Sequence, residues 1–134
     1  MINNTIQFIL VDDNEIDQLL NRKLIELVDP TFKVIQFIEA KAALNAIANG
    51  ELQVNDTINI MLLDIKMPVM DGFQFLELYH QLNAEIKDKY SIYMLSSSLN
   101  QYDISRANNN AYVKELLLKP LSKNTLTTLL QNFQ

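Results

Sequence analysis

Residues 58–72 read INIMLLDIKMPVMDG, and this stretch predicts a strand, a turn and the start of a helix. The run from Ile58 to Leu63 is almost continuously apolar, which is typical of a strand buried on both faces of a parallel sheet. Asp64 follows that strand directly. Asp71 is a suitable N-cap for a helix whose core-facing residues would be Phe75, Leu78, Tyr79 and Leu82. The segment therefore predicts a central strand with a carboxylate at its carboxyl end.

Short apolar segments of the same kind recur on both sides of this stretch and alternate with longer amphipathic segments. The other predicted strands are Ile6–Val11, Phe32–Ile38, Ile92–Leu95 and Val113–Leu118. Lys33 and Gln36 interrupt the second of these, so we expect it at an edge of the sheet. The alternation predicts a doubly wound α/β fold with helices on both faces of a parallel sheet, in one domain spanning residues 1–134.

The helices between these strands differ in how well their apolar residues are patterned. The first is predicted to begin after Asn14 and to pack through Ile16, Leu20, Leu24 and Leu27. An Ala-rich helix is predicted to end at Gly50, and the last helix to pack through Leu126, Leu129, Leu130 and Phe133. Residues 100–110 offer only Tyr102, Ile104 and Ala107, which predicts a loosely held helix.

The composition limits the functions that this chain can have. Its 134 residues carry a net charge of -5, which disfavours binding to the phosphate backbone of nucleic acids. The chain has no Cys and a single His, His80, so a bound metal would have to prefer oxygen ligands. The first twenty residues lack a basic leader, and the apolar runs are too short to cross a membrane. We therefore expect a cytoplasmic protein.

Polar residues follow four of the predicted strands at the points where they end: Asp12 and Asp13, Asp64, Ser96, and Lys119. Ligands of open parallel α/β sheets bind outside the carboxyl ends of the strands, so we expect these side chains to lie together. Three carboxylates in one pocket repel one another, so either their pKa values rise or a cation neutralises them, and we expect the cation. Mg²⁺ prefers this ligand set and is completed by a phosphate oxygen. The sequence thus predicts a Mg²⁺-assisted site for a phosphoryl group.

Three motifs at these spacings give the chain a family resemblance: Asp12-Asp13, the stretch DIKMPVMDG over residues 64–72, and Lys119-Pro120. Together the motifs resemble those of the CheY-like receiver domains of two-component response regulators, and the resemblance covers essentially the whole chain. It implies a stand-alone receiver with a flavodoxin-like (βα)5 fold and the strand order 2-1-3-4-5. It also implies a cis peptide bond before Pro120.

The resemblance implies a role for each matching residue. Asp64 resembles the phosphoacceptor, which takes a phosphoryl group from a phosphohistidine. Asp13 resembles a direct Mg²⁺ ligand and Asp12 a ligand through water, while the Lys66 main-chain carbonyl would be a further contact. The remaining two residues would bind the phosphoryl group: Lys119 by charge and Ser96 by a hydrogen bond that draws its loop inward. Lys66 and Ser98 would tune autodephosphorylation.

The resemblance also implies partners and leaves one step open. A sensor histidine kinase or a histidine phosphotransfer protein would donate the phosphoryl group, and a downstream protein or a second copy would read it. A homodimer would use the fourth helix, the fifth strand and the fifth helix. Leu116 stands where the family usually has an aromatic residue, and Asn108–Asn110 stands near a usual Gly-containing turn. Tyr102 or Tyr112 could substitute for the aromatic residue.

Other readings of the same residues lie in different functional classes. An Asp-nucleophile phosphohydrolase would need a second Asp two residues after its nucleophile, where this chain has Lys66 after Asp64 and Asn14 after Asp12. A nucleotide or flavin carrier would need a phosphate-binding loop after the first strand. A degenerate receiver acting only as a binding module would not need the complete set of site residues. We therefore expect a phosphoacceptor switch that catalyses only its own phosphorylation and slow dephosphorylation.

Overall fold

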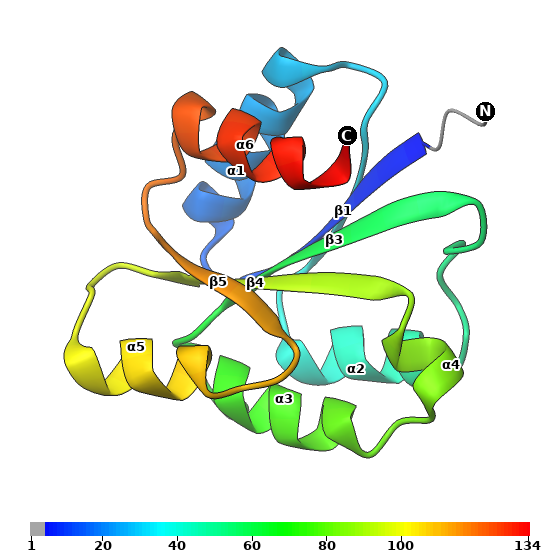
Figure 1. Cartoon of the computed structure of the whole chain (residues 1–134), viewed down its shortest axis with the longest axis vertical. Helices are drawn as coiled ribbons and strands as arrows, with labels where there is room; N and C mark the ends of the chain where they lie inside the picture. Colours follow the sequence, from blue (N-terminus) through cyan, green and yellow to red (C-terminus); the bar gives the residue numbers. More distant parts are fainter. Residues whose placement is uncertain (1–4) are drawn as a thin grey trace.

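The computed structural model describes residues 5–134 and contains a five-stranded sheet in which all paired strands are parallel (Figure 1). The strand order is β2-β1-β3-β4-β5, as the resemblance implied. The strands are β1 (Thr5–Val11), β2 (Lys33–Phe37), β3 (Thr57–Asp64), β4 (Tyr90–Ser96) and β5 (Val113–Leu118). The predictions that the strand before Asp64 is central and that the second strand lies at an edge are both confirmed.

Helices cover both faces of the sheet (Figure 1). On one face lie α1 (Glu15–Val28) and α6 (Lys123–Leu130), the latter followed by a short 3₁₀ turn, Gln131–Phe133. On the other face lie α2 (Ala40–Ala48), α3 (Gly72–His80) and α5 (Gln101–Asn108). The sequence did not predict α4 (Ala84–Lys87), a single turn after α3, so the predicted fourth and fifth helices are α5 and α6. Over residues 5–134 no helix is long and apolar enough to span a bilayer.

The side chains of β3 show how one strand supplies two hydrophobic cores. Ile60 and Leu62 pack with the core under α1 and α6, whereas Met61 and Leu63 pack with the core under α2, α3 and α5. All four are at most 1% exposed. Because successive side chains of a strand point to opposite faces, only a continuously apolar strand can serve both cores. This requirement explains the pattern on which the sequence analysis depended.

The buried face of α1 is not the one that its apolar pattern predicted. Of the predicted residues only Leu24 packs against the core, whereas Ile16, Leu20 and Leu27 are 68%, 53% and 74% exposed. The buried residues are Gln18, Asn21 and Ile25. The Gln18 amide donates to the main-chain carbonyls of Asp12 and Phe37, each at 2.9 Å. Both carbonyls lie at the rim where β1 and β2 end. Gln18 supplies a donor to the Asp12 carbonyl and a second donor to the Phe37 carbonyl, which also accepts from the Asp12 N–H, so a polar residue is buried in place of a leucine.

Two neighbouring residues of α1 provide a direct test of this orientation. Ile25 is fully buried and Leu27 is 74% exposed. Ile25→Val should therefore lower the free energy of unfolding by about 1 kcal/mol, because one buried methylene is lost. Leu27→Ala should change it by less than about 0.5 kcal/mol. Urea unfolding of both variants measures these changes. A larger loss of unfolding free energy in Leu27→Ala than in Ile25→Val would show that the face predicted from the sequence is the buried one.

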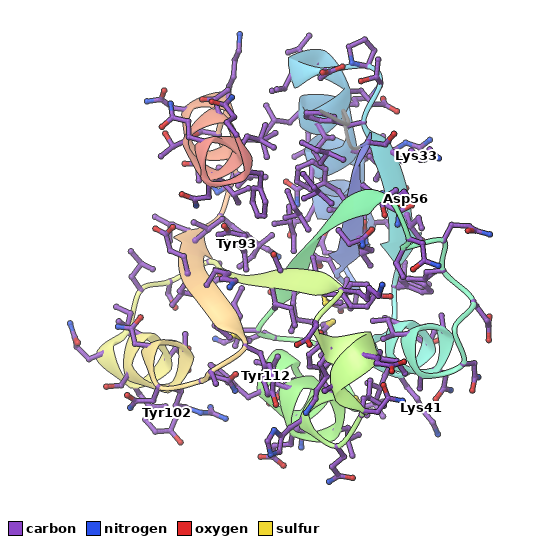
Figure 2. The ribbon with its side chains drawn as sticks, turned by 45° about the vertical axis from the view of Figure 1, so that its right-hand side comes forward. Lys33, Lys41, Asp56, Tyr93, Tyr102 and Tyr112 are labelled. Atoms are coloured by element: carbon purple, nitrogen blue, oxygen red, sulfur yellow. The ribbon has the colours of Figure 1, made fainter. Side chains whose placement is uncertain are left out.

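Two further helices differ in detail from prediction. Phe75 and Tyr79 of α3 are fully buried as predicted, but Leu78 is 38% exposed. On α5, Tyr102 is 70% exposed and lies on the outer side of the helix, so it does not anchor the helix to the core (Figure 2). Ala107 and the polar Asp103 are the buried residues of α5. That α5 is loosely held stays a prediction.

Candidate functional site

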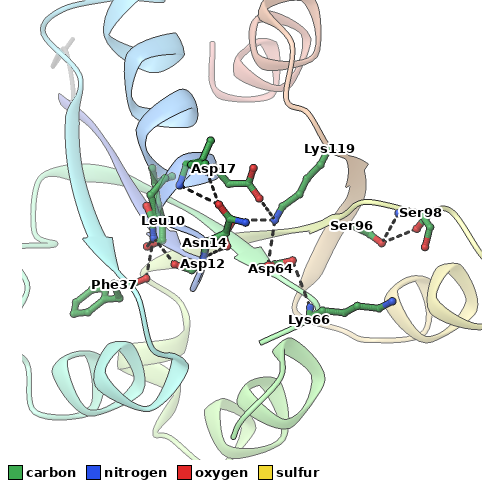
Figure 3. A network of polar contacts seen from close by, with 12 residues as sticks. Leu10, Asp12, Asn14, Asp17, Phe37, Asp64, Lys66, Ser96, Ser98 and Lys119 are labelled. Carbon is green, nitrogen blue, oxygen red and sulfur yellow. Dashed lines mark hydrogen bonds and ion pairs between the residues drawn. The ribbon is translucent and has the colours of Figure 1, made fainter. Parts of the chain in front are cut away.

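The polar residues of the candidate site converge at the carboxyl ends of β1, β3 and β5 (Figure 3). β1 pairs with β2 on one side and with β3 on the other. The connection from β1 to β2 runs toward one edge of the sheet and the later connections run toward the other edge, so the strand order reverses between β1 and β3. Crevices of doubly wound sheets form at this reversal. An open cavity of about 710 Å³ lies there, and its lining includes Asp13, Asp17, Asp64, Lys66, Ser97 and Lys119.

An ammonium group surrounded by carboxylates is the centre of the site (Figure 3). The Lys119 Nζ lies 2.9 Å from an oxygen of Asp12, 2.9 Å from one of Asp17 and 3.1 Å from one of Asp64. The Lys119 side chain is only 13% exposed. It reaches the site from the end of β5, where the Lys119–Pro120 peptide bond is cis, as the resemblance implied.

Burial and charge shift the protonation of two of these groups. Burial, and after it the neighbouring Asp12 charge, raise the pKa of Asp64 to about 6 even though Lys119 acts to lower it. For Lys119, burial alone would lower the pKa of the ammonium group. Its hydrogen bonds to Asp12 and Asp17 and the nearby negative charges outweigh burial, so its pKa lies above the usual range. The site therefore holds more negative charge than one lysine can balance.

Three of the carboxylates form a group that fits a divalent cation. One oxygen each from Asp12, Asp13 and Asp64 lies within 4.8 Å of the others. Asp12 and Asp64 are buried and Asp13 is exposed, so the group is open to solvent on one side. An all-carboxylate donor set with room for water suits Mg²⁺ in preference to Zn²⁺ or copper. The structure brings together the three side-chain ligands that the sequence predicted.

Local hydrogen bonds hold the first two carboxylates at the end of β1. The Asn14 backbone N–H donates to an Asp12 carboxylate oxygen at 2.9 Å, while the Asn14 side chain caps α1. The Asp12 backbone N–H donates to the Phe37 carbonyl of the β2 end at 3.0 Å. The predicted N-cap at Asn14 is thus confirmed, and it also orients Asp12.

The predicted serine lies next to Lys119, whose backbone N–H donates to the Ser96 carbonyl at 2.7 Å, but its hydroxyl bonds within its own loop. The Ser96 hydroxyl donates to the Ser98 carbonyl at 2.6 Å and accepts from the Ser98 backbone N–H, as Figure 3 shows. Of the three consecutive serines, Ser97 lines the cavity, whereas Ser96 and Ser98 do not. The Lys66 backbone N–H lies 3.4 Å from an Asp64 oxygen. A metal contact by the Lys66 carbonyl stays a prediction.

Two residues matter more to the site than the sequence indicated. Asp17 pairs with Lys119, although a charged residue in the first turn of a helix is usually explained by the helix dipole alone. Gly72, which looked like a simple turn residue, begins α3 directly against the end of β3. A Cβ atom on Gly72 would lie 2.5 Å from the Asp64 carbonyl oxygen. The Asp17 contact joins segments 102 residues apart, and the Gly72 contact depends on how the loop after β3 folds back, so neither follows from the period of one strand or helix.

The fold and the site define a class: doubly wound flavodoxin-like domains with an acidic group and a lysine at the sheet reversal. The chain belongs to the response regulator receiver domain family, which matches residues 8–131. It is similar to the crystal structure of a response regulator receiver protein from Dyadobacter fermentans DSM 18053 with 30% identity and a TM-score of 0.85, covering 96% of this chain and 98% of that one.

Two further relatives are similar over most of their lengths. A two-component response regulator from Cytophaga hutchinsonii has 26% identity and a TM-score of 0.83, with 97% of each chain covered. The probable methanogenesis regulatory protein FilR2 of Methanothrix harundinacea is 28% identical over 119 residues, which cover 85% of this chain and 72% of that protein. Receiver domains of this family are phosphoacceptor switches in phosphorelay signalling, and this membership is what the comparisons establish for the chain.

Proposed function

We propose that this receiver accepts a phosphoryl group on Asp64 from a phosphohistidine of a sensor histidine kinase or a histidine phosphotransfer protein. The observation that carries the proposal is the Asp64 carboxylate itself. It is 6% exposed, lines the cavity and lies 3.1 Å from a lysine ammonium group. A nucleophile needs access, and a developing phosphate needs a nearby positive charge; Asp64 has both.

The transfer requires one bond to form and one to break. An Asp64 carboxylate oxygen forms a bond to phosphorus while the bond from phosphorus to the histidine nitrogen breaks. The imidazole keeps that electron pair and takes up a proton. Lys119 neutralises charge on the phosphoryl oxygens, in keeping with the dominant role of positioning and charge in this chemistry. Mg²⁺ held by Asp12, Asp13 and Asp64, with the Lys66 carbonyl, would offset the remaining negative charge.

Signalling after transfer would begin at Ser96. Its hydroxyl now bonds within its own loop, to the Ser98 carbonyl. To donate to a phosphoryl oxygen it must leave that carbonyl, and the loop between β4 and α5 would move with it. Leu116 is half-buried on β5 and cannot act as an aromatic switch. Tyr112 is an unsuitable substitute, because its hydroxyl is paired with the His80 ring nitrogen at 2.6 Å and with Lys87 at 3.1 Å.

Exposed apolar side chains support protein partners on two surfaces. Ile16, Leu19 and Leu20 of α1 are each more than half exposed, and Ile16 lines the cavity. Such residues beside the site suit a phosphodonor that is itself a protein. On a second surface, Tyr102 of α5 and Leu118 of β5 are 70% and 47% exposed. They support a downstream contact or a homodimer through α5, β5 and α6.

Intact-mass measurement with a small phosphodonor tests the proposal. The native chain incubated with acetyl phosphate and Mg²⁺ should gain the mass of one phosphoryl group, and a metal chelator should suppress the gain. Asp64→Asn should gain nothing, because its amide cannot act as the nucleophile. Asp13→Asn, which keeps the acceptor but weakens the acidic group, should respond only at higher Mg²⁺ concentration. Uptake that survives in Asp64→Asn would refute the assignment.

The phosphohydrolase alternative has a separate test. A hydrolase of this type needs a carboxylic acid two residues after its nucleophile, and Lys66 occupies that position. We therefore expect no multiple turnover with small phosphate esters. An unmodified mass in the presence of both acetyl phosphate and Mg²⁺ would instead favour a receiver that acts only by binding.

A further inference from the structure

Asp17 is a partner of Lys119 that the proposed chemistry does not use. Its carboxylate accepts a hydrogen bond from the Lys119 Nζ at 2.9 Å, as short as the bond to the buried Asp12. Asp17 belongs to α1, whereas Asp12, Asp64 and Lys119 are placed by the sheet. It also lies outside the group of three carboxylates that fits a cation. Its pairing with Lys119 therefore needs its own explanation.

We infer that Asp17 is a positioning residue that holds the Lys119 ammonium group over Asp64 during phosphoryl transfer. The inference rests on the proposed function of the site. An ammonium group has three N–H donors, and in this structure Lys119 donates to Asp12 and Asp17 and forms an ion pair with Asp64. Asp64 is the proposed phosphoacceptor, and Asp12 is a proposed ligand of a cation that would repel Lys119. Asp17 is the partner with no second task.

The position of Asp17 is itself well determined. The Asp17 backbone N–H donates to the capping side chain of Asn14 at 3.0 Å, and the Asn14 N–H donates to Asp12. This chain of bonds joins the first turn of α1 to the end of β1. The Asp17 side chain is only 34% exposed, so its charge is partly shielded from solvent. A partner fixed in this way limits the motion of a long lysine side chain, which otherwise has many rotamers.

The test compares Asp17→Ala with Glu15→Ala at saturating Mg²⁺ and varied acetyl phosphate. Both variants remove an acidic residue from the first turn of α1, but Glu15 is exposed and, unlike Asp17, forms no ion pair with Lys119. The maximal rate of phosphoryl uptake should fall about tenfold in Asp17→Ala, because Lys119 is less well oriented. The acetyl phosphate concentration at half-maximal rate should not rise, since a negative charge has been removed from the cavity. Glu15→Ala should show much less change.

Two measurements separate a positioning role of Asp17 from a role in folding: the rate recovered by Asp17→Glu and the final fraction of protein phosphorylated. Asp17→Glu keeps a carboxylate on a longer side chain and should recover most of the rate. A purely structural role would lower the final fraction phosphorylated and leave the rate constant of the folded fraction unchanged, and that result would overturn the inference. A native rate in Asp17→Ala would overturn it as well. In both cases the uptake by the native chain would still support the proposed function.

A second readout does not depend on phosphorylation. The side-chain ammonium of a buried, fully paired lysine exchanges slowly enough to be seen in nitrogen-15 NMR spectra. In the native chain the Lys119 signal, identified by its loss in Lys119→Arg, should be visible without Mg²⁺ and should persist when Mg²⁺ is added. It should broaden or vanish in Asp17→Ala and remain in Glu15→Ala. Persistence of the Lys119 signal in Asp17→Ala would overturn the inference, whether or not the native chain takes up a phosphoryl group. Failure of the native chain to take up a phosphoryl group would refute the proposed function separately.

Discussion

Gly72→Ala is expected to destabilise the protein by about 3 kcal/mol, at the upper end of what overpacking usually costs. The added Cβ would lie 2.5 Å from the Asp64 carbonyl oxygen, 2.8 Å from the Met94 Cε and 3.1 Å from the Ile65 Cα. The methionine side chain can move, but the two backbone atoms cannot without displacing the end of β3. The Gly72 N–H also donates to the Ile65 carbonyl at 2.8 Å, which fixes the close approach.

Gly50→Ala is the matched control for this substitution. Gly50 has a φ of +68°, in the left-handed region, but a Cβ there meets nothing within 4 Å. Gly50→Ala should lower the free energy of unfolding by about 1 kcal/mol, which is the cost of the left-handed backbone conformation alone. Urea unfolding measures both variants. Equal losses would show that α3 can withdraw from β3 and that Gly72 is only a turn residue. Gly72→Ala should also slow phosphoryl uptake, because the shifted backbone carries Asp64.

Asp64→Asn is expected to make the metal-free protein more stable at pH 7.5, by about 2 kcal/mol. The pKa of Asp64 is raised to about 6 by burial and by Asp12, so the folded chain holds a charge that its surroundings disfavour. Because the folded-state pKa lies above the ordinary value of 3.8, the penalty is absent below about pH 4. It grows as the pH rises and is complete above about pH 6. The stabilisation by Asp64→Asn should therefore be absent below about pH 4 and complete above about pH 6.

Urea unfolding in the presence of a chelator, at several pH values, measures this effect. Asp56→Asn is the control, because Asp56 is an exposed carboxylate before β3 whose left-handed φ of 63° asparagine also tolerates. It should show little change at any pH. Added Mg²⁺ should reduce the advantage of Asp64→Asn, since the cation stabilises the native carboxylate. A gain that does not vary between pH 4 and 7.5 would contradict the electrostatic cause.

The sequence was informative wherever one strand or one helix end determined the outcome. The apolar run of β3, the N-caps Asn14 and Asp71, and the strand-end residues Asp12, Asp13 and Asp64 all behave as their local patterns predict. The parallel sheet then brings these carboxylates together without further information, because every strand ends at the same rim. The grouping of carboxylates at that rim was therefore predictable from residue types and spacing.

Patterns within a single element were misleading where two elements meet. The leucines of α1 suggested a core-facing stripe, but the buried position at the strand ends is taken by Gln18, whose amide donates to the carbonyls of Asp12 and Phe37. The predicted contact of Ser96 with a phosphoryl group stays a prediction. Without that group, the Ser96 hydroxyl at the end of β4 donates to the Ser98 carbonyl of its own loop.

By itself the sequence determined the fold class, the strand order through the family resemblance, and the set of groups at the carboxyl rim. Only the tertiary structure decided which face of α1 is buried, that Asp17 shares Lys119 with Asp12 and Asp64, and that Gly72 leaves no space beside Asp64. The reason is physical. Strand and helix periods are local properties of the chain, whereas the third partner of an ammonium group and the space for one methyl group depend on how distant segments pack.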